Sequence, residues 1–104
     1  MYKPEPIISE VADEIIRACA PVKILLMSNK YNTRRELTSF KLCIVVNDVP
    51  STAELEGELY MQTDSPVPFD ILIYNRSQWE ELVEEEDTFA AKVERTGVVL
   101  YGEG

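Results

Sequence analysis

The chain has 104 residues, of which 45% are apolar, so we expect a single folded domain spanning residues 1–104 rather than a disordered segment. Its formal net charge of −9 disfavours general nucleic-acid binding and docking on anionic membranes, because such a surface repels phosphate groups. The chain contains no histidine and no Cys-x-x-Cys spacing, which excludes the usual zinc sites and any nucleophile that a histidine would activate.

The first half of the chain predicts a helix followed by two strands. Apolar residues recur at helical spacing over residues 5–20, and Pro21 marks the end of this helix. The apolar run Val22–Met27 is typical of a strand buried on both faces. We expect Ser28–Thr38 to form a polar loop that leads into a second strand, Phe40–Val46. The apolar stripe of the helix consists of Ile8, Val11, Ala12, Ile15 and Cys19.

The middle of the chain predicts two helices separated by a strand. Residues Ser51–Glu54 have the pattern of a capping box, which opens a helix that extends to about Met61. The apolar segment Phe69–Tyr74 is expected to form the third strand. A second capping-box pattern, Ser77–Glu80, predicts a helix that extends to about Glu85.

The end of the chain predicts one more helix and one more strand. Asp87 or Thr88 is expected to cap the helix, and Gly97 is expected to end it in the left-handed conformation. The last strand is expected over Val98–Tyr101. This order of elements predicts an α/β (α+β) fold, in which a small mixed sheet of about four strands has helices packed mainly on one face.

The two cysteines and the apolar runs indicate the cellular compartment in which the protein is expected to lie. Cys19 and Cys43 lie in apolar stretches and are expected to be buried free thiols. The N-terminus lacks the apolar core of a signal peptide, and no apolar run approaches the roughly 20 residues that a membrane span needs. A cytoplasmic location is therefore expected.

Two stretches of the chain carry a recognisable arrangement of motifs. The segment Leu26–Val46 aligns without gaps with the pattern LFGSRARGxxxPDSDIDLLVV, in which a Gly-Ser loop precedes a strand bearing Asp-x-Asp. The segment Phe69–Tyr101 is similar to a closing pattern with a strand, a Trp-Glu helix and a final Gly-Val-Val-Leu-Tyr. The chain thus resembles the minimal nucleotidyltransferases of the DNA polymerase beta superfamily, and this resemblance implies a nucleotidyltransferase-like fold.

The resemblance also implies that the metal site of that family is degenerate in this chain. Phe40 and Leu42 stand at the positions of the two strand aspartates, and only Asp70, at the start of the third strand, is retained. Nucleotidyl transfer uses two divalent ions, and Mg²⁺ prefers carboxylate ligands. No cofactor is therefore expected, and Mg²⁺ would bind only if the domain were active. A residual metal site would require Glu36 to swing in beside Asp70.

The loop before the second strand departs from the family pattern as well. Ser28 and Asn29 replace the Gly-Ser pair, whereas Lys30 keeps the basic position that follows it. We interpret the basic residues of this loop either as a solvated surface or as a remnant anion site that holds phosphate without metal. The candidate phosphate-binding residues are Ser28, Asn29, Lys30, Arg34 and Arg35.

These substitutions predict a pseudoenzyme that acts through protein–protein contact, as an antitoxin or a regulator. In such a pseudoenzyme, Phe40 and Leu42 would be exposed at the entrance of the former active site. A partner or a second copy of the chain would then bury them. In an unrelated α/β fold they would simply belong to the core. The resemblance implies a small all-helical HEPN-type protein as partner, in a toxin–antitoxin pair. The alternatives are a nucleotide-binding sensor and an active enzyme that transfers a nucleoside monophosphate to a hydroxyl group.

Two further features lie near the C-terminus. Trp79 is expected to be an anchor of the core. The acidic run from Glu80 to Asp87 is expected to be a solvated helix face, with docking of a partner as the alternative.

Overall fold

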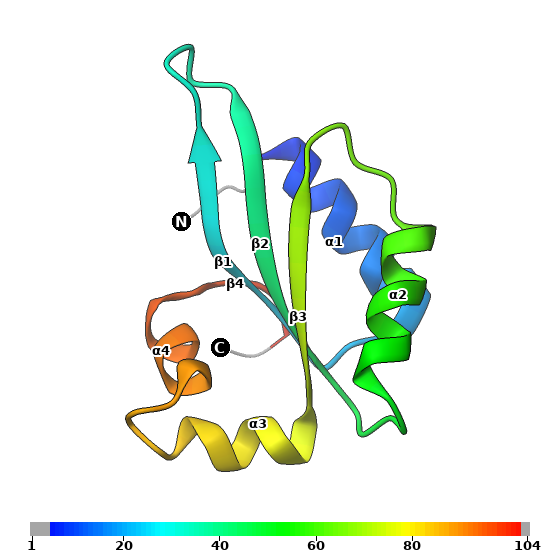
Figure 1. Ribbon diagram of the computed structural model, residues 1–104, viewed down its shortest axis with the longest axis vertical. Coiled ribbons are helices and arrows are strands. Elements are labelled where there is room, and N and C mark those ends of the chain that lie inside the picture. The colour runs from blue at the N-terminus through cyan, green and yellow to red at the C-terminus, as the bar shows by residue number, and fades with distance from the viewer. Residues whose placement is uncertain (1–4, 103–104) are drawn as a thin grey trace.

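Within residues 5–102, which the computed structural model describes, a four-stranded sheet forms the centre of the fold (Figure 1). The strands are β1 (Lys23–Tyr31), β2 (Leu37–Val46), β3 (Phe69–Asn75) and β4 (Val98–Tyr101). Their order across the sheet is β3-β2-β1-β4. The sheet is mixed, because β1 runs antiparallel to β2 and β4, whereas β2 and β3 run parallel to each other.

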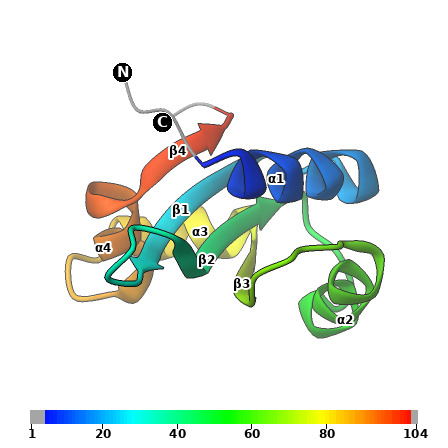
Figure 2. The same cartoon turned by 90° about the horizontal axis from the view of Figure 1, so that it is seen from above.

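Helices lie on both sides of this sheet (Figure 2). They are α1 (Pro6–Cys19), α2 (Thr52–Gln62), α3 (Arg76–Val83) and α4 (Phe89–Thr96). One side is enclosed by α1 together with α2, which lies beside β3, and the other side carries α3 and α4. The predicted mixed α/β fold is confirmed, but its helices are divided between the two faces. None of the helices in residues 5–102 has the length and apolar character that a membrane crossing requires.

The larger hydrophobic cluster lies between the sheet, α1 and α2. The stripe predicted for α1 supplies buried Ile8, Val11, Ala12 and Ile15, while Cys19 at the end of the helix is only half-buried. Full burial of an aliphatic side chain of this size contributes about 1.5–3 kcal/mol. Alternate residues of β2 project into the same cluster, as expected for a pleated strand. They are Phe40, Leu42, Ile44 and Val46.

A smaller cluster fills the space between the opposite face of the sheet, α3 and α4. Leu25 of β1 belongs to it, whereas its neighbour Ile24 belongs to the larger cluster, so the prediction that β1 is buried on both faces is confirmed. Trp79 of α3 is buried here, and its ring centroid lies 5.3 Å from that of Tyr74. The prediction that Trp79 is a core anchor is therefore confirmed.

The polar segment Ser28–Thr38 is not the loop that the sequence predicts. β1 and β2 continue through most of it as an antiparallel hairpin, and only residues 32–36 form the turn. The side-chain Oδ1 of Asn32 accepts hydrogen bonds from the backbone N–H groups of Arg34 and Glu36, at 2.9 and 3.0 Å. Because Asn32 organises the turn locally, the tip of the hairpin can extend beyond the helices.

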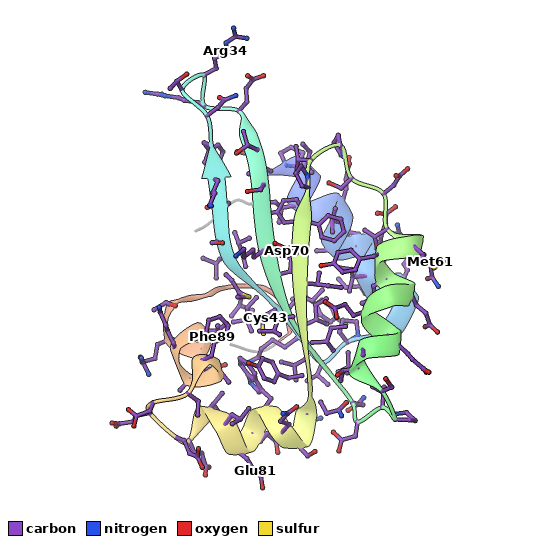
Figure 3. All side chains as sticks on the ribbon, in the orientation of Figure 1. Arg34, Cys43, Met61, Asp70, Glu81 and Phe89 are labelled. Atoms are coloured by element: carbon purple, nitrogen blue, oxygen red, sulfur yellow. The ribbon has the colours of Figure 1, made fainter. Side chains whose placement is uncertain are left out.

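The hairpin turn and the acidic run lie at opposite ends of the molecule. Figure 3 shows Arg34 at one end of the longest axis and Glu81 of α3 at the other. The molecule measures 40 Å along that axis. The acidic side chains of the run are all exposed, as predicted, but α3 ends at Val83, so only the first two of them belong to a helix. The run consists of Glu80, Glu81, Glu84, Glu85, Glu86 and Asp87.

Two of the expected helix caps are present. The Oγ of Ser51 accepts a hydrogen bond from the backbone N–H of Glu54 at 3.1 Å, so the predicted cap of α2 is confirmed. Of the two candidates for α4, it is Thr88 that caps the helix, because its Oγ1 accepts from the N–H of Ala91 at 3.1 Å. Each cap satisfies an N–H group that the first helical turn leaves unpaired.

Gly97 ends α4 for a reason other than the expected one. Its backbone is extended, with φ of −72°, so the prediction of a left-handed stop is wrong. A glycine is nevertheless needed, because a Cβ at this position would lie 2.7 Å from the carbonyl oxygen of Val93. The close approach of the chain to the end of the helix therefore selects this residue.

The start of α3 is held by a residue from a distant part of the sequence. The expected capping box at Ser77–Glu80 is wrong, because α3 begins at Arg76 and its cap residue Asn75 makes no side-chain capping bond. Instead, the carboxylate of Asp48 accepts hydrogen bonds from the backbone N–H of Ser77 at 3.1 Å and from its hydroxyl at 2.6 Å. The hydroxyl bond, followed by the N–H bond, holds the pKa of Asp48 below its ordinary value.

These bonds make the stability of the protein depend on Asp48 at acidic pH. The folded state favours the ionised carboxylate, so the stabilisation is present above the ordinary pKa of about 4 and is lost as pH falls through the lowered value. Asp48→Asn should therefore lower the urea midpoint at pH 7, and its difference from the wild type should shrink as pH falls below about 4. If the urea midpoints of the variant and the wild type differed by the same amount at pH 7 and in acid, this account would be contradicted.

Candidate functional site

Asp70 and the two positions that align with the aspartates of the nucleotidyltransferase pattern lie on opposite faces of the sheet. In the parallel pairing of β2 with β3, Asp70 is opposite Lys41, and paired residues project to the same face. Phe40 and Leu42 flank Lys41 and therefore point the other way, into the cluster beneath α1. Their side chains are 1% and 0% exposed. The expectation of an exposed apolar pair in an open mouth is wrong, because both side chains belong to the core.

The residues of β2 that share a face with Asp70 are its strand partner Lys41 together with Ser39, Cys43 and Val45, none of which is acidic. An ammonium group and a buried thiol thus lie on the Asp70 side, and neither replaces a carboxylate ligand. Among residues 5–102, no group of three Asp, Glu, Cys or His side chains is placed to hold a metal ion.

Glu36 does not complete a site with Asp70. It lies in the hairpin turn, where its Oε1 accepts a hydrogen bond from the Nδ2 of Asn32 at 3.1 Å. Five residue-to-residue steps of extended chain lead from Glu36 to Lys41, the strand partner of Asp70, which corresponds to about 16 Å. The two carboxylates are therefore held in different parts of the molecule.

Two of the five candidate phosphate-binding residues lie on the Asp70 face. Ser28 is paired with Lys41 across the β1–β2 hairpin, and Lys30 is paired with Ser39 one step further toward the turn. Ser28, Lys30 and Lys41 are all exposed. A hydroxyl group and two ammonium groups thus share one uncovered side of the sheet, and the sequence predicted the first two residues but not Lys41.

The other three candidates are directed elsewhere. Asn29 is paired with Phe40 and so projects from the opposite face, where its Nδ2 donates to the hydroxyl of Tyr31 at 3.4 Å. Arg34 and Arg35 are exposed residues of the hairpin turn. The structure therefore does not gather the five candidates into a single anion site.

The uncovered part of the Asp70 face forms a groove bordered by α4 and α2. A hollow of about 220 Å³ lies on the α4 side, and one of about 310 Å³ lies on the α2 side. Met27 and Lys41 line both hollows, so the two adjoin. Figure 3 labels Phe89 at the start of α4 and Asp70 on β3. We call this feature the open-face groove and define it by Met27, Lys41, Asp70, Leu72, Phe89 and Lys92.

The two sides of the open-face groove differ in charge. The α4 side is lined by Lys41 and Lys92 and contains no acidic residue. The α2 side is lined by Glu56 and Asp70, close to the hydroxyl of Tyr60. Lys41 lines this side as well, so positive charge is in excess along α4, and negative charge is in excess by a smaller margin along α2.

Tyr60 closes the α2 border of the groove. Its hydroxyl accepts a hydrogen bond from the backbone N–H of Ile71 at 2.8 Å and so covers part of the free edge of β3. Burial raises the pKa of Tyr60, the N–H of Ile71 lowers it, and the charges of Asp70 and Glu56 raise it further. The hydrogen bond from Ile71 holds the phenol at the border of the groove.

Sequence reasoning missed Lys41, Lys92 and Phe89 as members of this surface. One pattern could have indicated it, because Lys41 is a single cation within the otherwise apolar strand Phe40–Val46. A charge on a central strand, paired on both sides, is tolerated where no helix covers it.

Comparison of the chain with protein-family models, with curated proteins and with solved structures gives no match.

Proposed function

We propose that this protein is a nucleotidyltransferase-like pseudoenzyme that works by binding another protein. One observation carries the catalytic half of the proposal, namely that Asp70 shares its face with Lys41 and Cys43 instead of with other carboxylates. A two-metal mechanism needs several carboxylates converging within a few ångströms. Lys41 would moreover repel a divalent cation placed beside Asp70.

The binding half of the proposal is supported by the apolar side chains that border the uncovered sheet. Leu72 of β3 is 37% exposed and Phe89 of α4 is 48% exposed, although both are large and apolar. Exposed apolar groups that gather around a concave surface favour contact with a macromolecule. The resemblance makes a small all-helical protein of the HEPN type the first partner to test, in a toxin–antitoxin pair.

The catalytic half is tested by incubating the purified protein and its co-expressed genomic neighbour with labelled nucleoside triphosphates and Mg²⁺. We expect no transfer of label to either protein. Label that appears with the wild type and is lost in Asp70→Ala would overturn the proposal, because the retained aspartate would then serve catalysis.

The binding half is tested by size-exclusion chromatography with light scattering on the same co-expressed pair. We expect a complex of defined stoichiometry. Calorimetry with ATP, in the presence and absence of Mg²⁺, tests nucleotide sensing in parallel, and we expect no heat of binding at millimolar nucleotide. Saturable ATP binding together with a strictly monomeric protein would replace our proposal with a sensor function.

A further inference from the structure

We propose that the open-face groove receives an amphipathic helix of a partner protein, and that this helix carries acidic residues along the edge that faces α4. The inference rests on the proposed protein-binding function and specifies the chemistry of the partner. Three features of the groove carry it: the absence of a covering helix over this part of the sheet, the apolar side chains that line it and the different charges of its two borders.

The layer of helices on the Asp70 face is incomplete. α3 and α4 cover the part of the sheet near Cys43 and Trp79, while α2 packs with α1 on the opposite side, beside the free edge of β3 (Figure 2). The exposed Lys41 and Leu72 mark the part of the Asp70 face between α4 and that edge, which no helix covers. Lys41 of the central strand β2 is exposed for this reason. An α-helix has a diameter of about 10 Å, and one laid on this part of the sheet would lie beside α4 as the missing member of the layer.

The floor of the groove presents apolar groups at several positions along its length. Met27 of β1 and Leu72 of β3 rise from the sheet, and Phe89 projects from the first position of α4. Apolar residues that recur at three- and four-residue intervals on a helix would meet such a row. This pattern favours a helical occupant over a nucleotide, whose phosphates would gain nothing from the apolar groups.

The charges of the groove fix the character of the edges of that helix. Lys41 and Lys92 line the α4 side in a protein whose net charge is −9, and Lys30 extends the cationic row toward the hairpin turn. Glu56 and Asp70 line the α2 side and would repel an acidic edge. Acidic residues on the edge beside α4, with neutral or basic residues on the edge beside α2, are therefore complementary to this surface.

The experiment selects binders from a displayed library of random peptides of about 16 residues, roughly four helical turns, on the intact protein. Enriched peptides are synthesised, and their affinities are measured for the wild type and for Lys41→Glu and Lys92→Glu. Arg17→Glu is the matched control, because it makes the same change in charge at an exposed position of α1, on the other face of the sheet. Circular dichroism checks that each variant is folded.

We expect enriched peptides to combine apolar residues at helical spacing with Asp or Glu along one edge. Lys41→Glu and Lys92→Glu should each weaken binding about tenfold or more, while Arg17→Glu should change it less than about twofold. Raising the salt concentration should weaken binding to the wild type.

Three results would overturn the inference. These are the enrichment of neutral or basic peptides, equal affinity for all variants, and a failure to enrich any peptide. A dimer of the wild type that is lost in Lys41→Glu would overturn it as well, because a second copy would then occupy the groove. None of these results depends on turnover of nucleoside triphosphates. They can therefore overturn the proposed helix-binding groove without bearing on the proposal that the protein is catalytically inactive.

Discussion

Replacement of Leu42 by aspartate is expected to unfold the protein, although the family pattern has an aspartate at the aligned position. Leu42 is fully buried among the side chains beneath α1. Placing an unpaired carboxylate there costs several kcal/mol and also removes the packing of the leucine. This loss is comparable with the roughly 5–15 kcal/mol of stability that a domain of this size has in total. Urea unfolding followed by circular dichroism measures it.

Lys41→Asp is the matched control for this prediction, because it introduces the same residue one position away. The side chain of Lys41 is exposed on the opposite face, so this variant should remain folded, with a change in stability of about 1 kcal/mol or less. A cooperative unfolding transition of Leu42→Asp near that of the wild type would show that Leu42 lies on the open face. Unfolding of Lys41→Asp alone would lead to the same conclusion.

The two cysteines are expected to differ by orders of magnitude in their reaction with a thiol reagent. Burial, reinforced by the charge of Glu94 and partly offset by Lys23, raises the pKa of Cys43 to about 12. At pH 8 only about one part in 10⁴ of this thiol would be ionised, and the reactive species is the thiolate. Burial also raises the pKa of Cys19, but this residue lies at the end of α1 and is half-buried, so reagent can reach it.

An aromatic disulfide reagent at pH 8 should therefore modify one thiol in the native protein and the second only as the protein unfolds. Cys19→Ser should abolish the first phase and leave the second unchanged. In urea above the unfolding transition, both thiols should react at similar rates. Two equal and rapid phases in the native protein would show that Cys43 is accessible, and the packing of the smaller cluster would need revision.

The periodicity of the sequence predicts the helices and the strands in their order along the chain, because each of these elements has a local pattern. The stripe of α1 recurs at helical spacing, and β4 follows a glycine that closes the preceding helix. The outer half of the β1–β2 hairpin has no such pattern, because Leu37 is the only buried residue between Ser28 and Ser39. An extended segment of this kind cannot be distinguished from a loop by its hydrophobicity.

The side of the sheet on which the candidate site lies is not visible in the sequence for a related reason. From Leu42 to Val46 every residue of β2 is buried, so the strand does not alternate between apolar and polar residues. In β3 the exposed Leu72 interrupts the alternation that Asp70 begins. The sequence therefore contains no pattern that shows which residues of β2 lie on the same face of the sheet as Asp70. Only the pairing of β2 with β3 in the structure shows this.

The cap of α3 could not be predicted because it depends on contacts between distant residues. Asp48 and Ser77 are 29 positions apart, and the parallel arrangement of β2 and β3 brings the ends of these strands together. Local capping rules consider only the residues that flank a helix. The same limit applies to the open-face groove, whose defining residues come from three strands and one helix.

The β1–β2 hairpin gives the molecule a strong electric dipole moment. Four basic residues and one acidic residue lie between positions 28 and 46, whereas the chain as a whole is strongly acidic. Because the arginines of the turn and the glutamates of α3 lie at opposite ends of the 40 Å axis, this dipole is directed along the length of the protein. A negatively charged partner would therefore be oriented during its diffusional approach, meeting the hairpin first, and its association rate would fall as ionic strength rises.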